Sequence, residues 1–326
     1  MRKFSGYEYI QIAIANAWGL DKATWDVRLD WVNEINDQLE DYDAGADEPI
    51  LYRKAVRALR DAENSIPTGF CIGLDSTTSG YQLMSVLIGD DIGARNTNLI
   101  NTGKREDFYT KVAIEMNKLP NVDIDRSTIK KPCMTTAYGS KAQPMKVFGN
   151  NTPELAAFYK ILDQEAPGAM ELMKDIQSCW RSDVLYHKWT LPDGHVVRSK
   201  VTEPIDKRIE IQEFGGKSFT HRININQPTK YGISLLANVI HSYDAYVVRE
   251  VIRRCDFEVY TIHDAYYCSP VNMNQLRQHY LDILIELAKS DTMDNVLSDI
   301  LDRHAGFIKR SNNLSLKMHS AEYFLS

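Results

Sequence analysis

The chain has 326 residues, of which 44% are hydrophobic and 25% are charged, which is the composition of an ordinary globular protein. Its formal net charge of −6 argues against a free-standing nucleic-acid-binding protein, because such proteins usually carry a basic surface. No apolar run is long enough to span a bilayer and the N-terminus lacks the apolar segment of a secretory signal, so we expect no membrane partner.

The charge is unevenly distributed along the chain. Residues 126–230 carry 16 Lys and Arg against 11 Asp and Glu, so a basic middle segment lies between acidic ends. This distribution permits contact with nucleic acid through the middle segment without requiring it.

The cysteines are odd in number and scattered, and they form no C-x-x-C pair. This pattern argues against a zinc site or a disulfide framework, and it favours a reducing compartment such as the cytoplasm. The five positions are Cys71, Cys133, Cys179, Cys255 and Cys268.

The first 65 residues are predicted to be helical. Apolar residues recur there at helical spacing in two groups: Trp25, Leu29, Val32, Ile35 and Leu39, and then Tyr52, Val56 and Leu59. The acidic segment between the groups, EDYDAGADEP, is typical of a solvated loop.

A short apolar run from Gly69 ends in Asp75, which predicts a buried strand with a carboxylate at its tip. The Ser-Thr-Thr-Ser-Gly segment follows. An apolar helix is then expected from about Tyr81 to Ile88, with Ser79 as its N-cap. Another amphipathic helix is expected over residues 105–118.

The stretch from residue 126 to residue 139 has an unusual pattern. Arg126, Lys130, Met134 and Tyr138 recur every four residues, so in a helix they form a stripe that drifts slowly round one side. Two cations one turn apart, followed by an aromatic ring and a glycine, suit the phosphates and sugar of a nucleoside triphosphate. The alternative is a solvated basic helix, and Pro132 complicates both interpretations because it removes a backbone donor.

Residues 153–180 are again helical in pattern, and strands follow them. Residues 184–197 contain a Leu-Pro-Asp-Gly turn between two β-prone runs, which predicts a hairpin. A second ribbon is expected over residues 206–226, with isoleucines and phenylalanine alternating with polar residues that include Arg208, Arg222 and Asn224. One polar face of this kind suits a DNA groove, and the alternative is an ordinary half-exposed hairpin.

The last third of the chain returns to helix at residues 233–254, where His241 lies beside the apolar stripe. Residues 257–262 are predicted to form a strand, His263 and Asp264 a tight turn, and residues 265–268 the returning strand. A turn can present a carboxylate to a metal ion, although aspartate is also common in turns for structural reasons. One more helix is expected near residues 276–287.

Two strand-borne aspartates, Asp75 and Asp264, therefore bracket the basic helix in the sequence. Hard oxygen ligands suit Mg²⁺, which binds through one or two carboxylates together with substrate phosphates. Two such ions about 4 Å apart stabilise the attacking and leaving oxygens of an in-line displacement. With Arg126 and Lys130 on the phosphates, these residues predict a site for nucleotidyl transfer.

At this point the sequence resembles the single-subunit DNA-dependent RNA polymerases of phages and mitochondria. The segment from Asp75 to Gln82 resembles their motif A, D-x-x-x-S-G-x-Q; residues 126–139 resemble motif B, R-x-x-x-K-x(7)-Y-G; and His263-Asp264 resembles motif C. Further matching segments occur in the same order along nearly the whole chain: residues 13–22, 93–99, 107–113, 190–194 and 240–242, and the aromatic C-terminus, which resembles the family's terminal foot.

The resemblance implies roles for individual residues. Asp75 and Asp264 would bind two Mg²⁺ ions, and Ser76 would add its backbone carbonyl where the family usually has glycine. Arg126 and Lys130 would hold the triphosphate. Tyr138, aided by His241 and followed by Gly139, would sense the ribose 2′-hydroxyl. The residues that would support the site are Arg95, Tyr109, Ser79 and Gln82, and those that would contact DNA from the promoter-specificity ribbon are Arg208, Arg222 and Asn224.

The resemblance also implies an α+β fold of the right-hand polymerase type, mostly helical with a small antiparallel palm sheet. The expected division is a first palm segment (1–90), fingers (91–235) and a second palm segment with the foot (236–326). The sequence departs from the family in lacking its D-x-x-G-R motif, a thumb and a promoter-binding N-terminal domain. We therefore expect a second polymerase subunit to supply these parts in the cytoplasm of an infected bacterial host, with DNA template, NTPs and RNA product as the other partners.

Two other functions are alternatives to that of an RNA polymerase. A DNA polymerase of the same superfamily typically carries a glutamate in motif A and reads H-D-E in motif C, whereas no acid occurs here between Asp75 and Asp90 and motif C is followed by Ala265. The other rival is an inactive polymerase-like binding subunit, against which the presence of both aspartates, Arg126 and Lys130 argues.

Overall fold

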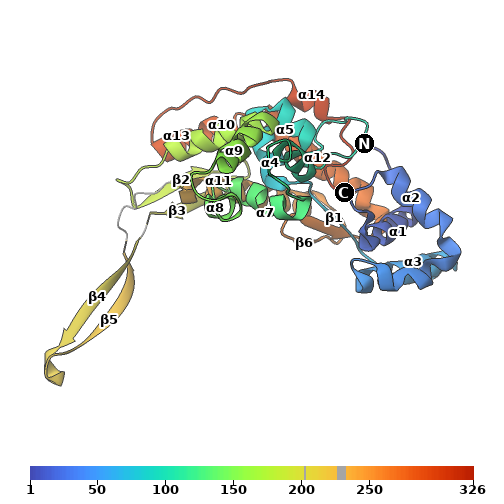
Figure 1. The fold of residues 1–326 in the computed structure, drawn as a ribbon, viewed down its shortest axis with the longest axis horizontal. Helices are drawn as coiled ribbons and strands as arrows, with labels where there is room; N and C mark the ends of the chain where they lie inside the picture. The colour runs from blue at the N-terminus through green and yellow to red at the C-terminus, as the bar shows by residue number, and fades with distance from the viewer. Residues whose placement is uncertain (202, 226–232) are drawn as a thin grey trace.

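The computed structural model describes residues 1–201, 203–225 and 233–326, and it has an α+β architecture of many helices with three small antiparallel sheets (Figure 1). For residues 203, 204, 224, 225 and 233 the description covers the backbone only. The helices up to the middle of the chain are α1 (Gly6–Ala15), η1 (Asn16–Leu20), α2 (Trp25–Glu34), η2 (Asn36–Gly45), α3 (Pro49–Glu63), α4 (Ser79–Ile88), α5 (Asp91–Asn96), α6 (Phe108–Met116), α7 (Arg126–Thr136) and α8 (Ala142–Phe148).

The remaining helices are α9 (Pro153–Glu165), α10 (Pro167–Ser178), η3 (Gln212–Phe214), α11 (Ile233–Arg254), η4 (Pro270–Asn272), α12 (Met273–Lys289), α13 (Thr292–Leu301) and α14 (Leu314–Met318). The strands are β1 (Ile72–Asp75), β2 (Tyr186–Thr190), β3 (Val196–Lys200), β4 (Glu203–Ile211), β5 (Lys217–Ile225), β6 (Tyr260–Ile262) and β7 (Ala265–Cys268). Both predicted hairpins, β2–β3 and β4–β5, are confirmed.

The central sheet has the strand order β1-β7-β6 and brings together two segments that are far apart in the sequence. Asp75, the last residue of β1, pairs with Ala265, the first residue of β7. The two-residue turn between β6 and β7 therefore lies directly beside the end of β1. This register places the two predicted carboxylates at the same edge of the sheet.

Among the described residues, the buried apolar side chains form two hydrophobic clusters. The larger one joins residues from α4, α6, α7, α9 to α12 and the central sheet, so it draws on all three predicted segments of the chain. The smaller one lies between α1, α3 and η2. A single large core holds β1, α4, α7 and α11 in fixed positions, because interiors of native packing density leave little room for relative movement. The division at residues 90 and 235 stays a prediction.

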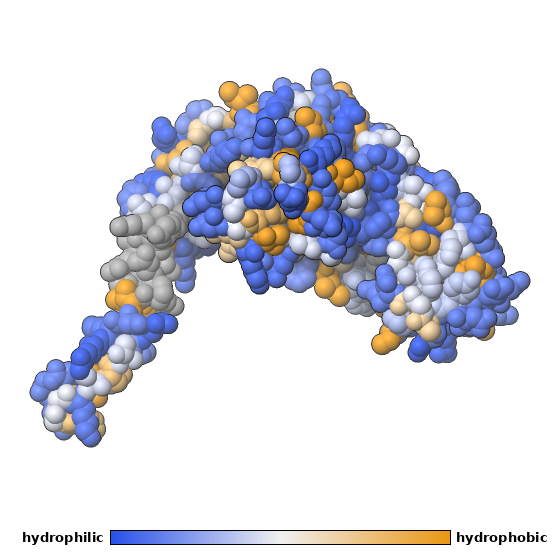
Figure 2. Space-filling view, viewed as in Figure 1, coloured by the Kyte–Doolittle hydropathy of each residue, from blue (hydrophilic) through white to orange (hydrophobic). Residues whose placement is uncertain are grey.

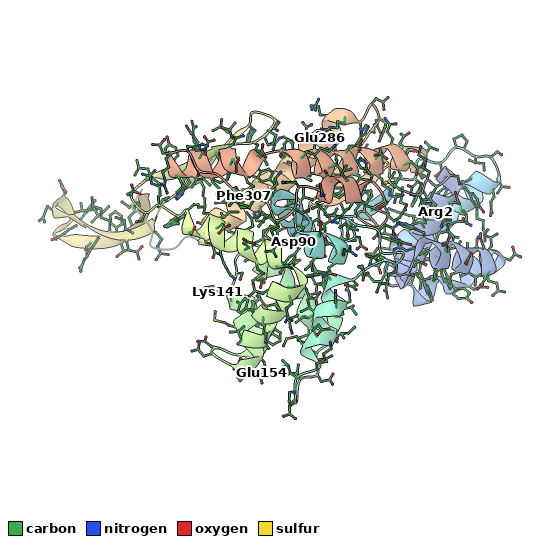
Figure 3. All side chains as sticks on the ribbon, turned by 90° about the horizontal axis from the view of Figure 1, so that it is seen from above. Arg2, Asp90, Lys141, Glu154, Glu286 and Phe307 are labelled. Atoms are coloured by element: carbon green, nitrogen blue, oxygen red, sulfur yellow. The ribbon has the colours of Figure 1, made fainter. Side chains whose placement is uncertain are left out.

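Two parts stand out from this body. Figure 3 shows that α8, which begins just after Lys141, and α9, which carries Glu154, extend to one side of the body, next to α6. The β4–β5 ribbon projects at the far end from α1–α3, and Figure 2 shows it standing clear of the body with hydrophilic and apolar side chains along its length. Within the ribbon, Ile209 pairs with Phe219 and Asp206 with Arg222, which confirms the predicted alternation of apolar and polar faces.

One local prediction needs correction. Ser79 is not the N-cap of α4 but its first residue, because Thr78 precedes it in the left-handed conformation (φ 68°) and ends the tight turn after Asp75. The helix therefore begins earlier than expected, and Ser79 is free to face the cavity described below. The helical pattern predicted over 153–180 is confirmed, and it consists of two helices, α9 and α10, because the chain breaks at Ala166 before Pro167, in agreement with the restriction that proline places on the preceding residue.

Candidate active site

The predicted motif residues meet at one cavity of about 850 Å³. Its walls come from the edge of the central sheet, the first turns of α4 and α6, one side of α7 and the middle of α11. Seven of the predicted site residues line it: Asp75, Ser76, Arg126, Lys130, Tyr138, His241 and Asp264. Tyr109 and Ser79 also line it, whereas Gln82 is buried behind it and binds backbone carbonyls of Thr97 and Phe324.

The two aspartates are held side by side by the backbone around Ser76. The Ser76 amide donates to the carbonyl oxygen of Asp264 at 3.1 Å, and the Ser76 hydroxyl donates to its Oδ2 at 2.9 Å. The turn before Asp264 has a positive φ of 55° at His263, a conformation that few residues other than glycine adopt. This conformation at a two-residue hairpin turn fixes the direction in which Asp264 leaves the sheet.

The electrostatics of the pair are those of two like charges sharing one cavity. Removal from bulk water, and then the neighbouring Asp264 carboxylate, raises the pKa of Asp75, while Lys22 and Lys130 oppose that rise. Two carboxylates open to a cavity, without further fixed ligands, form the donor set that Mg²⁺ uses when substrate phosphates complete its coordination. In the described parts of the chain there is no group of three or more His, Cys, Asp or Glu arranged to hold a metal by themselves.

The cations on α7 have different environments. Arg126 forms an ion pair with Asp107, and its guanidinium lies 5.6 Å from the centre of the Tyr109 ring, so its direction is fixed before any ligand binds. Burial, the largest single influence, raises the pKa of Asp107, but the hydrogen bond and charge of Arg126 together with hydrogen bonds from Thr110 outweigh it, so the pKa of that carboxyl is lowered. Lys130, one turn later, is exposed to the cavity. The helix continues through Pro132, and Asp125 caps its start.

Tyr138 follows the end of α7 and is held by His241 and Asp244. Gly139 after it has φ +83°, a backbone conformation that favours glycine. The Tyr138 ring lies 4.5 Å from the His241 ring at an angle of 36°, and the Tyr138 hydroxyl donates to Asp244 Oδ2 at 3.3 Å. Burial lowers the pKa of His241, which favours its neutral form.

Several cavity residues were not identified from the sequence. Asp21 and Lys22 enter from the end of η1, Arg105 and Asp107 from the segment before α6, and Asp244 from α11. Burial lowers the pKa of Lys22 and of Arg105. Spacing gave a usable signal for Asp244, because it lies three residues after His241 and so on the same helix face. The others lie near segments that resemble the polymerase family, but only the fold brings their side chains together.

The ribbon residues lie away from the cavity. Arg222 pairs with Asp206 at 2.7 Å, and the Arg208 Nε donates to Ser218 Oγ at 2.8 Å, both on the exposed polar face. For Asn224 the side chain lies outside the described residues. Arg95 is exposed on α5 and does not line the cavity, so its predicted supporting role is indirect at most.

The buried carboxyl of Asp244 gives a prediction on stability. Burial, and then the nearby Asp264, raises the pKa of Asp244 to about 7, while Tyr138 and Ser79 oppose that rise. Because the folded state binds this proton more tightly than the unfolded state, the ionised carboxyl destabilises the fold increasingly from about pH 4 to pH 7. Asp244→Asn is therefore expected to melt several degrees higher than wild type at pH 8 and to melt alike at pH 4, as measured by calorimetry. An equal difference at both pH values would contradict the assignment.

Comparisons with known proteins find similar sequences, and the matched ranges include residues that line the cavity. Residues 3–148 match the family model described as DNA-dependent RNA polymerase, a range that includes Asp75 and α7. The chain is 24% identical to the DNA-directed RNA polymerase of Pseudomonas phage phiKMV, over 87% of this chain and 44% of that protein. It is 21% identical to T7 RNA polymerase of Escherichia phage T7, over 94% of this chain and 45% of that protein.

A third similar protein comes from a fungus. A probable DNA-directed RNA polymerase of Neurospora crassa is 27% identical over 41% of this chain and 18% of that protein. The chain thus spans less than half the length of the curated relatives that it matches. In the part of the chain that the structure describes, no helix is long and apolar enough to cross a membrane.

Proposed function

We propose, on the premise that this chain belongs with the phage- and mitochondrial-type DNA-dependent RNA polymerases, that it carries the nucleotidyl-transfer centre of such an enzyme. The reaction joins a ribonucleoside monophosphate from an NTP to the 3′ end of RNA on a DNA template and releases pyrophosphate. The observation that carries the proposal is the pairing of β1 with β7, which sets Asp75 and Asp264 at one edge of the cavity that also receives α7.

The carboxylates would hold two Mg²⁺ ions, assisted by the Ser76 backbone carbonyl. When bound, two such ions stabilise the attacking and leaving oxygens of an in-line phosphoryl displacement. Asp264 is oriented for this role by the two hydrogen bonds from Ser76. Burial and the neighbouring Asp264 raise the pKa of Asp75, and a bound cation would favour its ionised form.

The α7 cations would bind the triphosphate. Arg126 is directed by Asp107 and Tyr109, so it presents its remaining donors without the cost of ordering a free side chain. Lys130 adds a second charge one turn along the helix. Cations of this kind stabilise the negative charge that develops on the pyrophosphate leaving group.

The sugar would lie against Tyr138 and His241. Both rings line the cavity, and His241 enters it from α11. A phenol and an imidazole at this place offer polar atoms to a ribose 2′-hydroxyl, and no glutamate from motif A occupies the space. We therefore propose ribonucleotides rather than deoxyribonucleotides as substrates.

The β4–β5 ribbon would contact DNA through Arg208, Arg222 and Asn224. Its support is the alternation of faces and its position clear of the body (Figure 2). Replacing Arg208 and Arg222 together by alanine should weaken DNA binding and reduce the salt slope of log K by about two, because each phosphate contact contributes about 0.9 to that slope. Lys141→Ala, on a different lobe, provides a charge-removal control. An unchanged slope would leave the ribbon without a DNA-binding role.

A second polypeptide would supply the N-terminal domain, the thumb and the D-x-x-G-R motif. In the described part of the chain, β6 is one of the two outer strands of the central sheet, and its Tyr260 and Ile262 are exposed. An exposed apolar edge strand is a common surface for association with another chain. The assembled enzyme would act in the infected host cytoplasm.

The test is an RNA synthesis assay with the complex purified from its native source. The chain is purified from its native source together with whatever co-purifies, and extension of an RNA primer on a DNA template is measured with NTPs or dNTPs. Incorporation of ribonucleotides by the complex supports the proposal. Preferential use of dNTPs would indicate that the protein is a DNA polymerase. Absence of any synthesis would indicate an inactive, polymerase-like binding subunit. Processive transcription by this chain alone would overturn the two-chain proposal.

A further inference from the structure

The Tyr138 ring is confined between two elements. A Cβ added to Gly80 would lie 3.3 Å from the Tyr138 Cζ and equally close to its hydroxyl, which is tighter than an ordinary van der Waals contact, so the first turn of α4 lies close against the ring. The His241 ring packs against it with the centres 4.5 Å apart. The phenol therefore has little freedom to move, and the direction of its hydroxyl hydrogen is the remaining variable.

Asp244 determines that direction. The Tyr138 hydroxyl donates to Asp244 Oδ2 at 3.3 Å, and the Ser79 hydroxyl interacts with both side chains. Asp244 lies on α11 three residues after His241, so one rigid helix carries both the ring partner and the hydrogen-bond partner of Tyr138. This helix is anchored in the large core by residues on its other side, including Tyr243, whose hydroxyl bonds to Thr292.

A phenol hydroxyl has one hydrogen to donate and lone pairs that accept. When its hydrogen is given to Asp244, the oxygen faces the remainder of the cavity only as an acceptor. A ribose 2′-hydroxyl can donate to such an oxygen, whereas a deoxyribose offers nothing to it. A site with a polar atom that only the correct substrate satisfies rejects the analogue lacking the matching group.

We propose that Asp244 is a specificity-determining positioning residue, which makes the Tyr138 hydroxyl an obligatory acceptor and thereby selects ribonucleotides over deoxyribonucleotides. This inference rests on the proposed function and adds to it a residue outside the three polymerase motifs. A protonated carboxyl retains a carbonyl oxygen that accepts in the same position, so the arrangement holds in either ionisation state of Asp244. Without the Asp244 side chain, the hydroxyl is free to rotate and to donate into the cavity, where it no longer discriminates against deoxyribose.

The experiment measures kcat/KM for ATP and for dATP in single-nucleotide extension by the complex as purified. Asp244→Ala should lower the ATP preference by about tenfold, within a range of roughly 5- to 150-fold that corresponds to one unsatisfied buried hydrogen-bonding group. Asp244→Asn retains a carbonyl acceptor and should keep the preference within about threefold of wild type. Thermal melting and the Mg²⁺ concentration for half-maximal rate are recorded for every variant.

Two further variants separate positioning from general loosening of α11. Tyr243→Phe removes a buried hydroxyl hydrogen bond from the neighbouring residue, on the side away from the cavity, and should leave the ATP preference unchanged. Tyr138→Phe should lower the preference, and adding Asp244→Ala to it should lower it no further, because both changes act through the same hydroxyl.

The outcomes distinguish this inference from the proposed function. If wild type prefers ATP and Asp244→Ala prefers it equally, the inference alone is overturned. The inference is also overturned if Asp244→Ala raises the Mg²⁺ requirement with the preference intact, since the carboxyl would then serve the metal ions. Wild type that incorporates no ribonucleotide would overturn the proposed function, and this inference with it.

Discussion

Replacing Asp264 by asparagine should lower nucleotide incorporation by about a thousandfold or more, because a bound metal stabilises transition-state charge by several kcal/mol and each 1.36 kcal/mol is a factor of ten. An amide still fits the turn and still accepts from the Ser76 hydroxyl. The fold should therefore persist, and removing one of two neighbouring like charges should not lower the melting temperature. Single-nucleotide extension and Mn²⁺ binding by relaxation measurements provide the two readouts.

The matched control for this change is Asp282→Asn on α12, which removes a carboxylate that does not line the cavity. Asp282 bonds to Gln278 on the same helix, so the chemical change is the same while the site is untouched. Activity equal to wild type is expected for this control. Full activity of Asp264→Asn would show that Asp264 is not a metal ligand. Mn²⁺ binding by this variant as tight as that of wild type would show the same.

The second large effect is expected at Lys130. Lys130→Ala should lower kcat/KM for NTP by about 10- to 150-fold, because a hydrogen bond to a charged group contributes roughly 1.5–3 kcal/mol. Lys130 is exposed to the cavity and pairs with no carboxylate among the described residues, so its loss should leave the melting temperature unchanged. Steady-state extension with increasing NTP separates the effect on KM from that on kcat.

Lys131 offers a control one residue away. It is exposed on the same helix but does not line the cavity, so Lys131→Ala removes the same charge from the same element without affecting the site. Equal losses for the two alanine variants would mean that the helix acts only through its general positive charge. Lys130→Arg, which retains the charge with a different shape, should recover part of the activity.

Much of the site could be predicted from the sequence because the signals are local. The four-residue spacing places Arg126, Lys130 and Met134 on one side of a helix wherever that helix lies, and Tyr138 continues the stripe just past its end. The strand that ends in Asp75 and the turn that contains Asp264 were likewise visible as an apolar run and a turn between two β-prone segments. All four charged residues line the cavity in the structure.

The prediction at Ser79 failed for a reason outside its own segment. Serine before an apolar run is ordinarily a good N-cap. Here Thr77 is tied to the C-terminal segment by the bond from its amide to the Phe324 carbonyl, which forces a tight left-handed turn at Thr78. The helix starts within that turn, and no local propensity of Ser79 indicates it.

By itself, the sequence determined which elements form and which face of each carries charge, because periodicity, caps and turn residues act over a few neighbours along the chain. Only the tertiary structure decided that β1 pairs with β7, that Asp107 directs Arg126, and that Asp244 receives the Tyr138 hydroxyl. Each of these contacts joins residues between 19 and 196 positions apart. Such contacts depend on how the helices and strands pack into one core, and spacing along the chain does not encode that packing.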